Sequence, residues 1–184
     1  GLGRKLEMLE SSLALVAGVP NETALPLAYW RGGQRPPAGE AMDPDRDGCG
    51  LIWYAPLVPM RPDTVRDYVE FVTGVMRAHR LEPLVTLTSL SERCFDSSVP
   101  LLFDPSSPGE AERARACSVT LLEEGRKRGF VPYRVGIDAM GWLTSRPCTF
   151  WELVGEIKRC IDPAALIAPG RYARFAPPAP RDPG

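Results

Sequence analysis

Spaced apolar positions divide the chain into a series of predicted helices. Apolar residues three and four positions apart predict a helix over the first 16 residues, and a second with one wide apolar face over residues 62–79. A third helix is predicted over 106–129, where basic residues and Gly129 suit a helix end. A fourth is predicted over 150–160, before a proline that stops it. Each helix has apolar residues to cover another layer of structure.

Four shorter apolar runs predict strands between these helices. Residues 49–59 are apolar on both faces, which is typical of a buried strand, although proline interrupts it. Partial alternation over 82–90, an apolar run over 99–103 and another over 129–137 predict three more strands. Residues 32–48 are rich in Gly, Pro, Asp and Arg and predict a loop. The order strand, helix, strand, strand, helix, strand predicts a ferredoxin-like α+β fold, with helices on one face of an antiparallel sheet.

Composition narrows the class of protein. A length of 184 residues suits one domain or a large piece of a bigger protein. A net charge of −1 with scattered Lys and Arg argues against nucleic acid or an anionic membrane as partner. Five cysteines at irregular spacing and one histidine argue against a zinc site or a disulfide framework, and indicate buried free thiols in a reducing compartment. We expect a soluble protein, cytoplasmic rather than periplasmic.

Most candidate chemical sites have a plain structural interpretation. His79 lies at the polar end of a predicted helix, and we expect a surface residue. Asp43, Asp45 and Asp47 are spaced like the start of a calcium loop, but the Gly and Glu of that pattern are missing, which favours a solvated turn. Neither GxGxxG nor GxxxxGK occurs. This chain therefore has no glycine-rich phosphate-binding loop of the usual kind with which to bind a nucleotide cofactor.

Tyr133 and Arg134 place a phenol beside a guanidinium in the middle of a predicted strand. Arg is rarely buried without a partner, and its permanent charge can pair with an oxyanion and lower a phenol pKa by about 1 to 3 units. The pair therefore suits a bound phenolate. A salt bridge from Arg134 to a helix carboxylate such as Glu156 is the alternative, and composition alone favours it. Neighbouring strand residues face opposite ways, so both can reach one ligand only if the backbone turns, as Pro132 permits.

Four ordered segments resemble the carboxy-terminal half of the vanillyl-alcohol oxidase and 4-cresol dehydrogenase (p-cresol methylhydroxylase) flavoprotein family. They are residues 25–31, residues 47–59, the Tyr133–Arg134 pair, and residues 161–163 together with 167–172. The resemblance extends from residue 25 to residue 172. It implies a cap, or substrate, domain that closes over the flavin ring of an FAD domain lying mostly upstream and absent here. The uncapped start of the first helix likewise predicts missing upstream residues.

The resemblance also implies a reaction and a division of the chain. Tyr133 and Arg134 would hold a para-alkyl phenol or 4-hydroxybenzylic alcohol as its phenolate. Hydride would leave the benzylic carbon for the FAD, giving a quinone methide that water or another nucleophile attacks. The expected segments are an incomplete helix and loop over 1–48, the ferredoxin-like cap over 49–161, a return segment toward the FAD domain over 162–176, and a disordered tail over 177–184.

Several site features differ among members of the resembled family. Oxidases often link the flavin to a histidine near the start of the strand that matches residues 49–54, and this chain has none there. The dehydrogenase branch uses a tyrosine, for which Tyr29 and Tyr54 are the candidates. We therefore favour the dehydrogenase branch, in which a cytochrome c subunit accepts the electrons. Gly170 and Arg171 match a turn that returns to the flavin, where Arg171 would contact the ring, with a surface arginine as the alternative.

The resemblance further implies a homodimer. Two other functions stay open at this stage. One is a flavin oxidoreductase of a 2-hydroxy acid, because related flavoenzymes share a similar cap. The other is a non-catalytic ferredoxin-like binding domain without a flavin partner.

Overall fold

The computed structural model describes residues 2–33, 36 and 39–172. The chain forms two compact units, Gly1–Pro132 and Tyr133–Gly184. The tail predicted over 177–184 lies outside the described residues.

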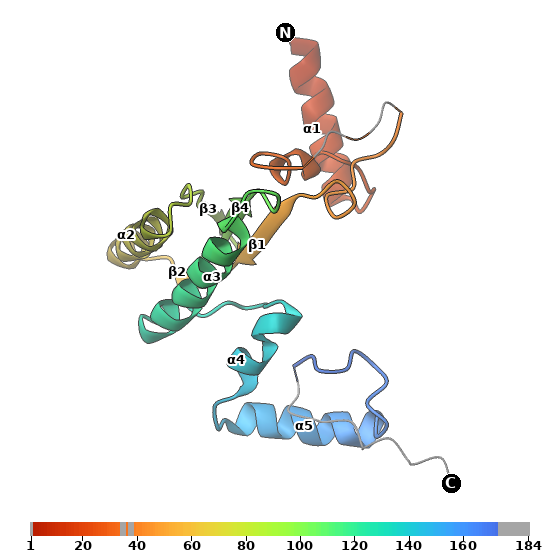
Figure 1. The fold of residues 1–184 in the computed structure, drawn as a ribbon. Coiled ribbons are helices and arrows are strands. Elements are labelled where there is room, and N and C mark those ends of the chain that lie inside the picture. The colour runs from red at the N-terminus through yellow and green to blue at the C-terminus, as the bar shows by residue number, and fades with distance from the viewer. Residues whose placement is uncertain (1, 34–35, 37–38, 173–184) are drawn as a thin grey trace. The chain divides into compact units, whose positions relative to one another are not determined.

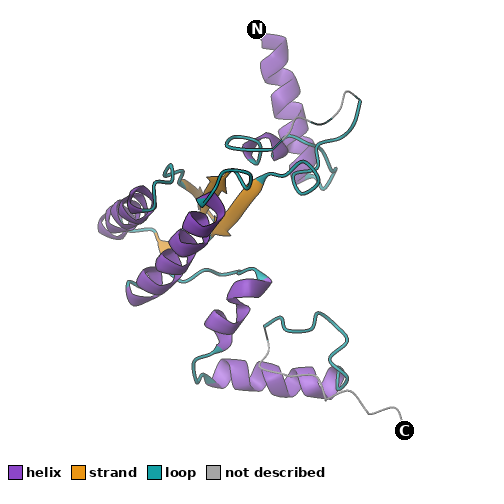
Figure 2. Ribbon diagram, in the orientation of Figure 1, coloured by secondary structure: helices purple, strands orange, loops and turns teal. Residues whose placement is uncertain are grey.

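The first unit is built on a four-stranded antiparallel sheet (Figure 2). Its strands are β1 (Gly50–Tyr54), β2 (Leu57–Pro59), β3 (Thr86–Ser89) and β4 (Cys94–Phe103). β1 and β2 pair with β4 in one unbroken register, with Tyr54 opposite Val99 and Leu57 opposite Asp96. Between them the Ser97 N–H donates to the Pro56 carbonyl at 3.0 Å. β1 and β2 are therefore one strand that Pro56 interrupts, as the sequence predicted, and β3 occupies the other edge of β4.

The strand predicted over 129–137 is almost entirely absent, which corrects the sequence prediction. It is reduced to a bridge between Pro56 and Pro132 and a hydrogen bond of 3.4 Å from the Leu57 N–H to the Val131 carbonyl. Two facing prolines have no N–H groups to donate, so the ladder cannot continue. The bridge still lies beside β1 and β2, which gives the sheet order of a ferredoxin-like unit. The α+β fold class is confirmed.

Two helices cover one face of this sheet (Figure 1). They are α2 (Pro62–Ala78) and α3 (Glu110–Lys127), close to the predicted ranges. α3 begins four residues later than predicted because the preceding turn is held by the Asp104 carboxylate, which accepts the Ser106 N–H at 2.9 Å. The core between helices and sheet consists of large side chains that are at most 1% exposed, including Tyr54, Val58, Tyr68, Val72, Met76, Val99, Leu101 and Leu121.

A helix and a long loop precede the sheet. α1 (Leu2–Val16) confirms the first predicted helix, and the 3-10 helix η1 (Leu25–Leu27) follows. His79, expected at the surface, is half-buried at the end of α2 and its Nε2 lies 3.3 Å from the Thr120 Oγ1 on α3. It therefore joins two helices.

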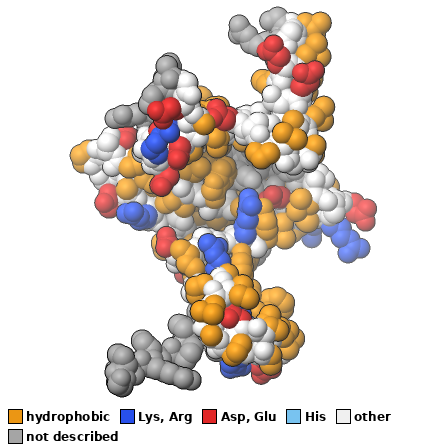
Figure 3. All heavy atoms as spheres, turned by 90° about the vertical axis from the view of Figure 1, so that its right-hand side faces the viewer, with side chains coloured by type: hydrophobic (Ala, Val, Ile, Leu, Met, Phe, Trp, Pro, Cys, Tyr) orange, Lys and Arg blue, Asp and Glu red, His pale blue; other side chains and the backbone are white. Residues whose placement is uncertain are grey.

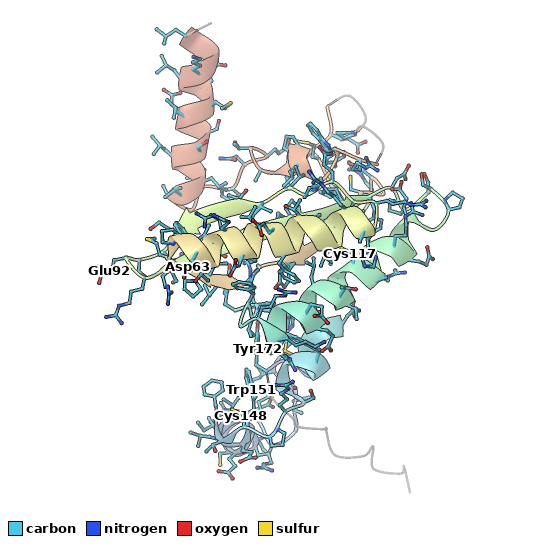
Figure 4. The ribbon with its side chains drawn as sticks, turned by 90° about the vertical axis from the view of Figure 1, so that its left-hand side faces the viewer. Asp63, Glu92, Cys117, Cys148, Trp151 and Tyr172 are labelled. Carbon is cyan, nitrogen blue, oxygen red and sulfur yellow. The ribbon has the colours of Figure 1, made fainter. Side chains whose placement is uncertain are left out.

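The second unit is mostly helical. The 3-10 helix η2 (Ile137–Ala139) begins at the last residue of the predicted strand, and α4 (Met140–Thr144) follows it; the sequence predicted neither. α5 (Thr149–Ile161) confirms the last predicted helix. After α5 the chain turns back, and the ring of Tyr172 stacks on Trp151 with a centroid distance of 6.3 Å (Figure 4).

The composition predicted that the cysteines are free and buried. All five are free, but not all of them are buried. Cys117 is buried in α3, whereas Cys148 and Cys160 are exposed in the second unit. Burial raises the pKa of the Cys117 thiol to about 11. Among the described helices, none is long and apolar enough to cross a membrane.

Candidate functional site

Tyr133 and Arg134 follow the bridge at Pro132 and open the second unit. Instead of continuing as a strand, the backbone bends at both residues. The Arg134 guanidinium carbon lies 5.2 Å from the centroid of the Tyr133 ring. This is the geometry of a cation–π contact. The two side chains therefore lie together, as the expected turn after Pro132 would allow.

Both side chains are open to solvent, which corrects the expectation of a buried arginine. Tyr133 is 40% exposed and Arg134 is exposed. Within the described ranges, no ion pair within 4.0 Å joins Arg134 to Glu156 or to any other carboxylate. The salt bridge that composition favoured is therefore not formed. A permanent cation next to an aromatic face is left accessible to a ligand.

Tyr29 belongs to a closed polar cluster in the first unit. Its hydroxyl donates to the Asp47 Oδ2 at 2.6 Å, and Arg46 binds both oxygens of the same carboxylate at 2.7 and 3.0 Å. Asp47 is only 9% exposed, so the predicted solvated turn is wrong at this position. The hydrogen bonds from Arg46 and then Tyr29 hold the pKa of Asp47 well below its usual range.

The cluster keeps the Tyr29 phenol protonated. Burial, followed by the hydrogen bond to Asp47, raises the pKa of Tyr29 to about 12. A phenol that forms a covalent bond through its oxygen reacts more readily as the phenolate. The surroundings of Tyr29 act in the opposite direction.

Tyr54 is part of the core. It is 1% exposed, and its hydroxyl donates to the Phe130 carbonyl at 2.9 Å. A Cβ placed on Gly125 of α3 would lie only 2.2 Å from that hydroxyl oxygen. Burial raises the pKa of Tyr54 far above its ordinary value. Its surroundings therefore give Tyr54 a structural role.

Gly170 and Arg171 lie in a strained turn of the second unit. Gly170 has φ +74, and three non-glycine residues nearby, Ala165, Ala168 and Tyr172, also have positive φ between 43 and 53. Such conformations persist only when surrounding contacts hold them. Arg171 is exposed, and its N–H donates to the Ala168 carbonyl at 3.2 Å.

A buried carboxylate fastens this turn to α5. The Asp162 carboxylate accepts the N–H groups of Leu166 and Ile167, each at 2.9 Å, and is bound by Lys158. Lys158 also donates to the Ile167 carbonyl. Asp162 is 5% exposed, and its pKa is lowered, first by the Lys158 hydrogen bond. The sequence offered no signal for this contact beyond the Asp-Pro stop of the helix.

The second face of the sheet is a site feature that the sequence did not reveal. Tyr54 and Ser97 face the helices, because Tyr54 lies against Gly125 and the Ser97 hydroxyl is 2.6 Å from that of Tyr68. The alternate positions, including Trp53 and Leu57, therefore point to the other side. Trp53 is 51% and Leu57 is 37% exposed. Both faces of this strand are apolar in sequence, so the pattern could not show which one α2 and α3 cover.

Comparison with known proteins gives related sequences, although no family model matches the chain. The 1'-carboxy-chondrochloren decarboxylase of Chondromyces crocatus is 39% identical over 155 residues, 84% of this chain and 28% of the relative. The 4-cresol dehydrogenase [hydroxylating] flavoprotein subunit of Pseudomonas putida is 28% identical over 158 residues, 85% of this chain and 27% of the relative. The chain thus spans little more than a quarter of the length of these curated relatives.

Solved structures give the same result. Substrate-bound p-cresol methylhydroxylase matches with a TM-score of 0.69 and 28% identity, over 84% of this chain and 27% of that protein. The 4-ethylphenol oxidase of Gulosibacter chungangensis, in complex with isoeugenol, matches with a TM-score of 0.71 over 91% of this chain and 30% of that protein. At 18% identity the second match shows the fold alone. The chain is related to FAD-linked oxidases of the p-cresol methylhydroxylase type and matches a segment of about 27% of their length.

Proposed function

We propose that this chain is the substrate-cap portion of an FAD-dependent oxidoreductase that acts on para-alkyl phenols or 4-hydroxybenzylic alcohols. The observation that carries the proposal is the accessible guanidinium of Arg134 over the Tyr133 ring. Relatedness to the 4-cresol dehydrogenase flavoprotein subunit supports the substrate class. An Arg with no carboxylate partner among the described residues is ready to receive an anionic oxygen.

Arg134 and Tyr133 would bind and activate the phenol. The guanidinium donates charge-assisted hydrogen bonds to the phenolic oxygen and favours its deprotonated form. The Tyr133 ring offers an aromatic surface beside that oxygen. A phenolate releases electron density toward the para carbon, which favours loss of hydride from the attached benzylic carbon and formation of a quinone methide. The bound FAD supplies the hydride acceptor.

The described residues fit the ring of a flavin better than its diphosphate. Within the first unit, the sheet face opposite α2 and α3 carries the exposed indole of Trp53 and the side chain of Leu57, which suit a flat aromatic ring. The sequence has no glycine-rich phosphate loop. We therefore propose that the FAD dinucleotide is held mainly by residues outside this chain, and that Arg171 contacts the ring.

The placement of both candidate tyrosines supports a flavin that is held without a covalent link to this chain. Tyr29 is held protonated by Asp47, and Tyr54 lies in the core. A cytochrome c subunit as electron acceptor and a homodimer stay part of the proposal, on the resemblance alone.

A decarboxylation is the second candidate function. The 39% identity to 1'-carboxy-chondrochloren decarboxylase favours it specifically, because this relative is more similar than the cresol enzyme. In that reaction a phenol would carry a carboxylate, the carbon–carbon bond to it would break, CO2 would leave, and the electron pair of that bond would pass to the bound FAD in place of a hydride. Incubating the full-length flavoprotein with 4-cresol and with a 4-hydroxyphenyl carboxylic acid, and measuring CO2 release alongside flavin reduction, distinguishes the two.

Arg134→Ala in the full-length flavoprotein tests the proposed role. With 4-chlorophenol, which has no benzylic hydrogen to transfer, we expect affinity to fall about tenfold to a hundredfold, because a charged hydrogen-bond partner is lost. With 4-cresol the pH optimum should rise toward the free phenol pKa of about 10. Arg159→Ala, an exposed arginine on α5, is the matched control and should change neither. Unaltered affinity and pH profile in Arg134→Ala would show that the role is assigned wrongly.

A further inference from the structure

The return segment, residues 162–172, keeps an unusual backbone although few of its side chains are buried. It loops back alongside α5 (Figure 1). Leu166 is 79% and Ile167 is 66% exposed, like many apolar side chains on the surface of the second unit (Figure 3). Its left-handed residues persist only when surrounding contacts hold them; they are Ala165, Ala168, Gly170 and Tyr172. Burial of the Leu166 and Ile167 side chains does not supply that hold.

Two buried charges hold the first half of the segment. The Asp162 carboxylate accepts the Leu166 and Ile167 N–H groups and is bound by Lys158, which also donates to the Ile167 carbonyl. The Asp162 side chain is 5% exposed and that of Lys158 is 16% exposed. Hydrogen bonds to charged groups withdrawn from water are stronger than those between neutral groups. The carboxylate and the ammonium therefore fix the backbone that leads to Arg171.

Contacts on both sides of Arg171 fix its own backbone. Before it, a Cβ on Gly170 would lie 3.6 Å from the Ile137 Cδ1, so the turn lies against η2. After it, the Tyr172 ring stacks on Trp151 of α5. The Arg171 side chain is exposed, and no carboxylate of the described residues lies within 4.0 Å of its guanidinium. A cation is thus left available on a backbone that cannot shift freely.

We propose that Asp162 and Lys158 are positioning residues for Arg171: they close the turn before it and so fix the place from which its guanidinium meets the flavin ring. The inference rests on the ring contact proposed for Arg171 above. A hydride brings negative charge to the ring, and a cation already in place stabilises that charge without reorganising. Holding Arg171 in place therefore raises the reduction potential of the bound flavin.

The reduction potential of the flavin in the full-length flavoprotein tests the inference. Arg171→Ala should lower the equilibrium constant for two-electron reduction about tenfold, which is about 30 mV. Asp162→Asn should lower it about threefold, because the guanidinium remains but is no longer held. Loss of a negative charge would by itself raise the potential, so the expected fall is opposite to a simple charge effect. Glu156→Gln, which removes an exposed carboxylate from α5, is the matched control and should cause no fall.

A double variant shows whether Asp162 acts through Arg171. Asp162→Asn combined with Arg171→Ala should have the potential of Arg171→Ala alone, since residues that act through one group are not additive. Lys158→Met leaves both N–H bonds of Asp162 in place, and its fall in potential should likewise vanish when Arg171 is alanine. This second pair provides the same test if Asp162→Asn does not fold, as checked by far-UV circular dichroism.

The outcomes separate this inference from the proposal on which it rests. A potential that falls in Arg171→Ala but not in Asp162→Asn or Lys158→Met would overturn the positioning role and leave the ring contact standing. A fall that persists when Arg171 is alanine would also overturn it. An unaltered potential in Arg171→Ala would overturn the ring contact and this inference together. The affinity of Arg134→Ala for 4-chlorophenol tests the phenol site independently of all three results.

Discussion

The tyrosines of the two units show how similar side chains serve different purposes. In the first unit each hydroxyl has a partner within the fold: Tyr29 donates to Asp47, Tyr54 donates to the Phe130 carbonyl, and Tyr68 bonds with Ser97. In the second unit the ring of Tyr133 is 40% exposed beneath the Arg134 guanidinium. The phenols of the first unit are therefore structural, whereas the exposure of Tyr133 and Arg134 in the second unit supports the ligand-binding role proposed for them.

The arginines show the same contrast. Arg46 binds both oxygens of Asp47 and also Glu40 at 3.0 Å, so its charge is balanced inside one loop. For Arg134 no carboxylate lies within ion-pair distance in the described part of the chain. An arginine near a tyrosine in the fold, as Arg46 is near Tyr29, is thus not enough to mark a site. The location of the nearest carboxylate in the fold decides between the two roles.

The largest expected effect comes from crowding the structural hydroxyl of Tyr54. A Cβ on Gly125 would meet that oxygen at 2.2 Å and the Phe130 carbonyl oxygen at 3.0 Å. Gly125→Ala should therefore lower the free energy of unfolding by about 3 kcal/mol, measured in urea. Gly74→Ala on α2 has open space around its Cβ and should raise it by about 0.5 to 1 kcal/mol. Equal effects of the two variants would show that Tyr54 is not packed as described.

A second effect concerns the ionisation of Tyr29. Its raised pKa means that the stabilising contribution is complete below the ordinary pKa of 10 and is lost as the pH rises toward about 12. Asp47→Asn removes the carboxylate charge, so the pKa of Tyr29 should fall toward 10, as followed by NMR of the labelled ring carbon. Asp45→Asn, an exposed residue of the same loop, is the control. A Tyr29 pKa that does not respond to Asp47→Asn would rule out this carboxylate as a cause.

The smallest expected effect is local to the return segment. The lowered pKa of Asp162 means that its stabilising contribution is present above about pH 4 and is lost as the pH falls further. Asp162→Asn should reproduce that loss at neutral pH and reduce the hydrogen-exchange protection of the Leu166 and Ile167 amides about tenfold. Glu156→Gln, exposed on the same helix, should leave both amides protected. Equal protection in the two variants would mean that Asp162 does not hold the segment.

Much of the fold follows from local pattern. The periodicity that predicted α2 and α3 arises from the face each helix buries against the sheet, and this is a property of consecutive residues. Local pattern could not show whether residues 129–137 form a strand. These residues are an apolar run, as a strand requires, but the strand does not form because Pro132 lies opposite Pro56, 76 positions earlier.

Prediction of the candidate site depended still more on contacts between residues that are far apart in the sequence. The Tyr133–Arg134 pair could be found because its two side chains are adjacent in the sequence. Whether Arg134 would reach Glu156, or Tyr29 would reach Asp47, depends on how separate segments meet. Asp47 resembled its solvated neighbours Asp43 and Asp45 in the sequence, and only its contact with Tyr29 and Arg46 distinguishes it.

The ionisation state of a bound phenol tests the central claim most directly. Carbon-13 NMR of 4-chlorophenol labelled at the hydroxyl-bearing carbon reports whether the ligand bound to the full-length flavoprotein is phenol or phenolate. A pH titration of this signal gives the pKa of the bound ligand. The account predicts a pKa about 1 to 3 units below that of the free phenol, and the loss of this shift in Arg134→Ala. A bound phenol whose pKa is not lower than that of the free ligand would contradict the role assigned to Arg134.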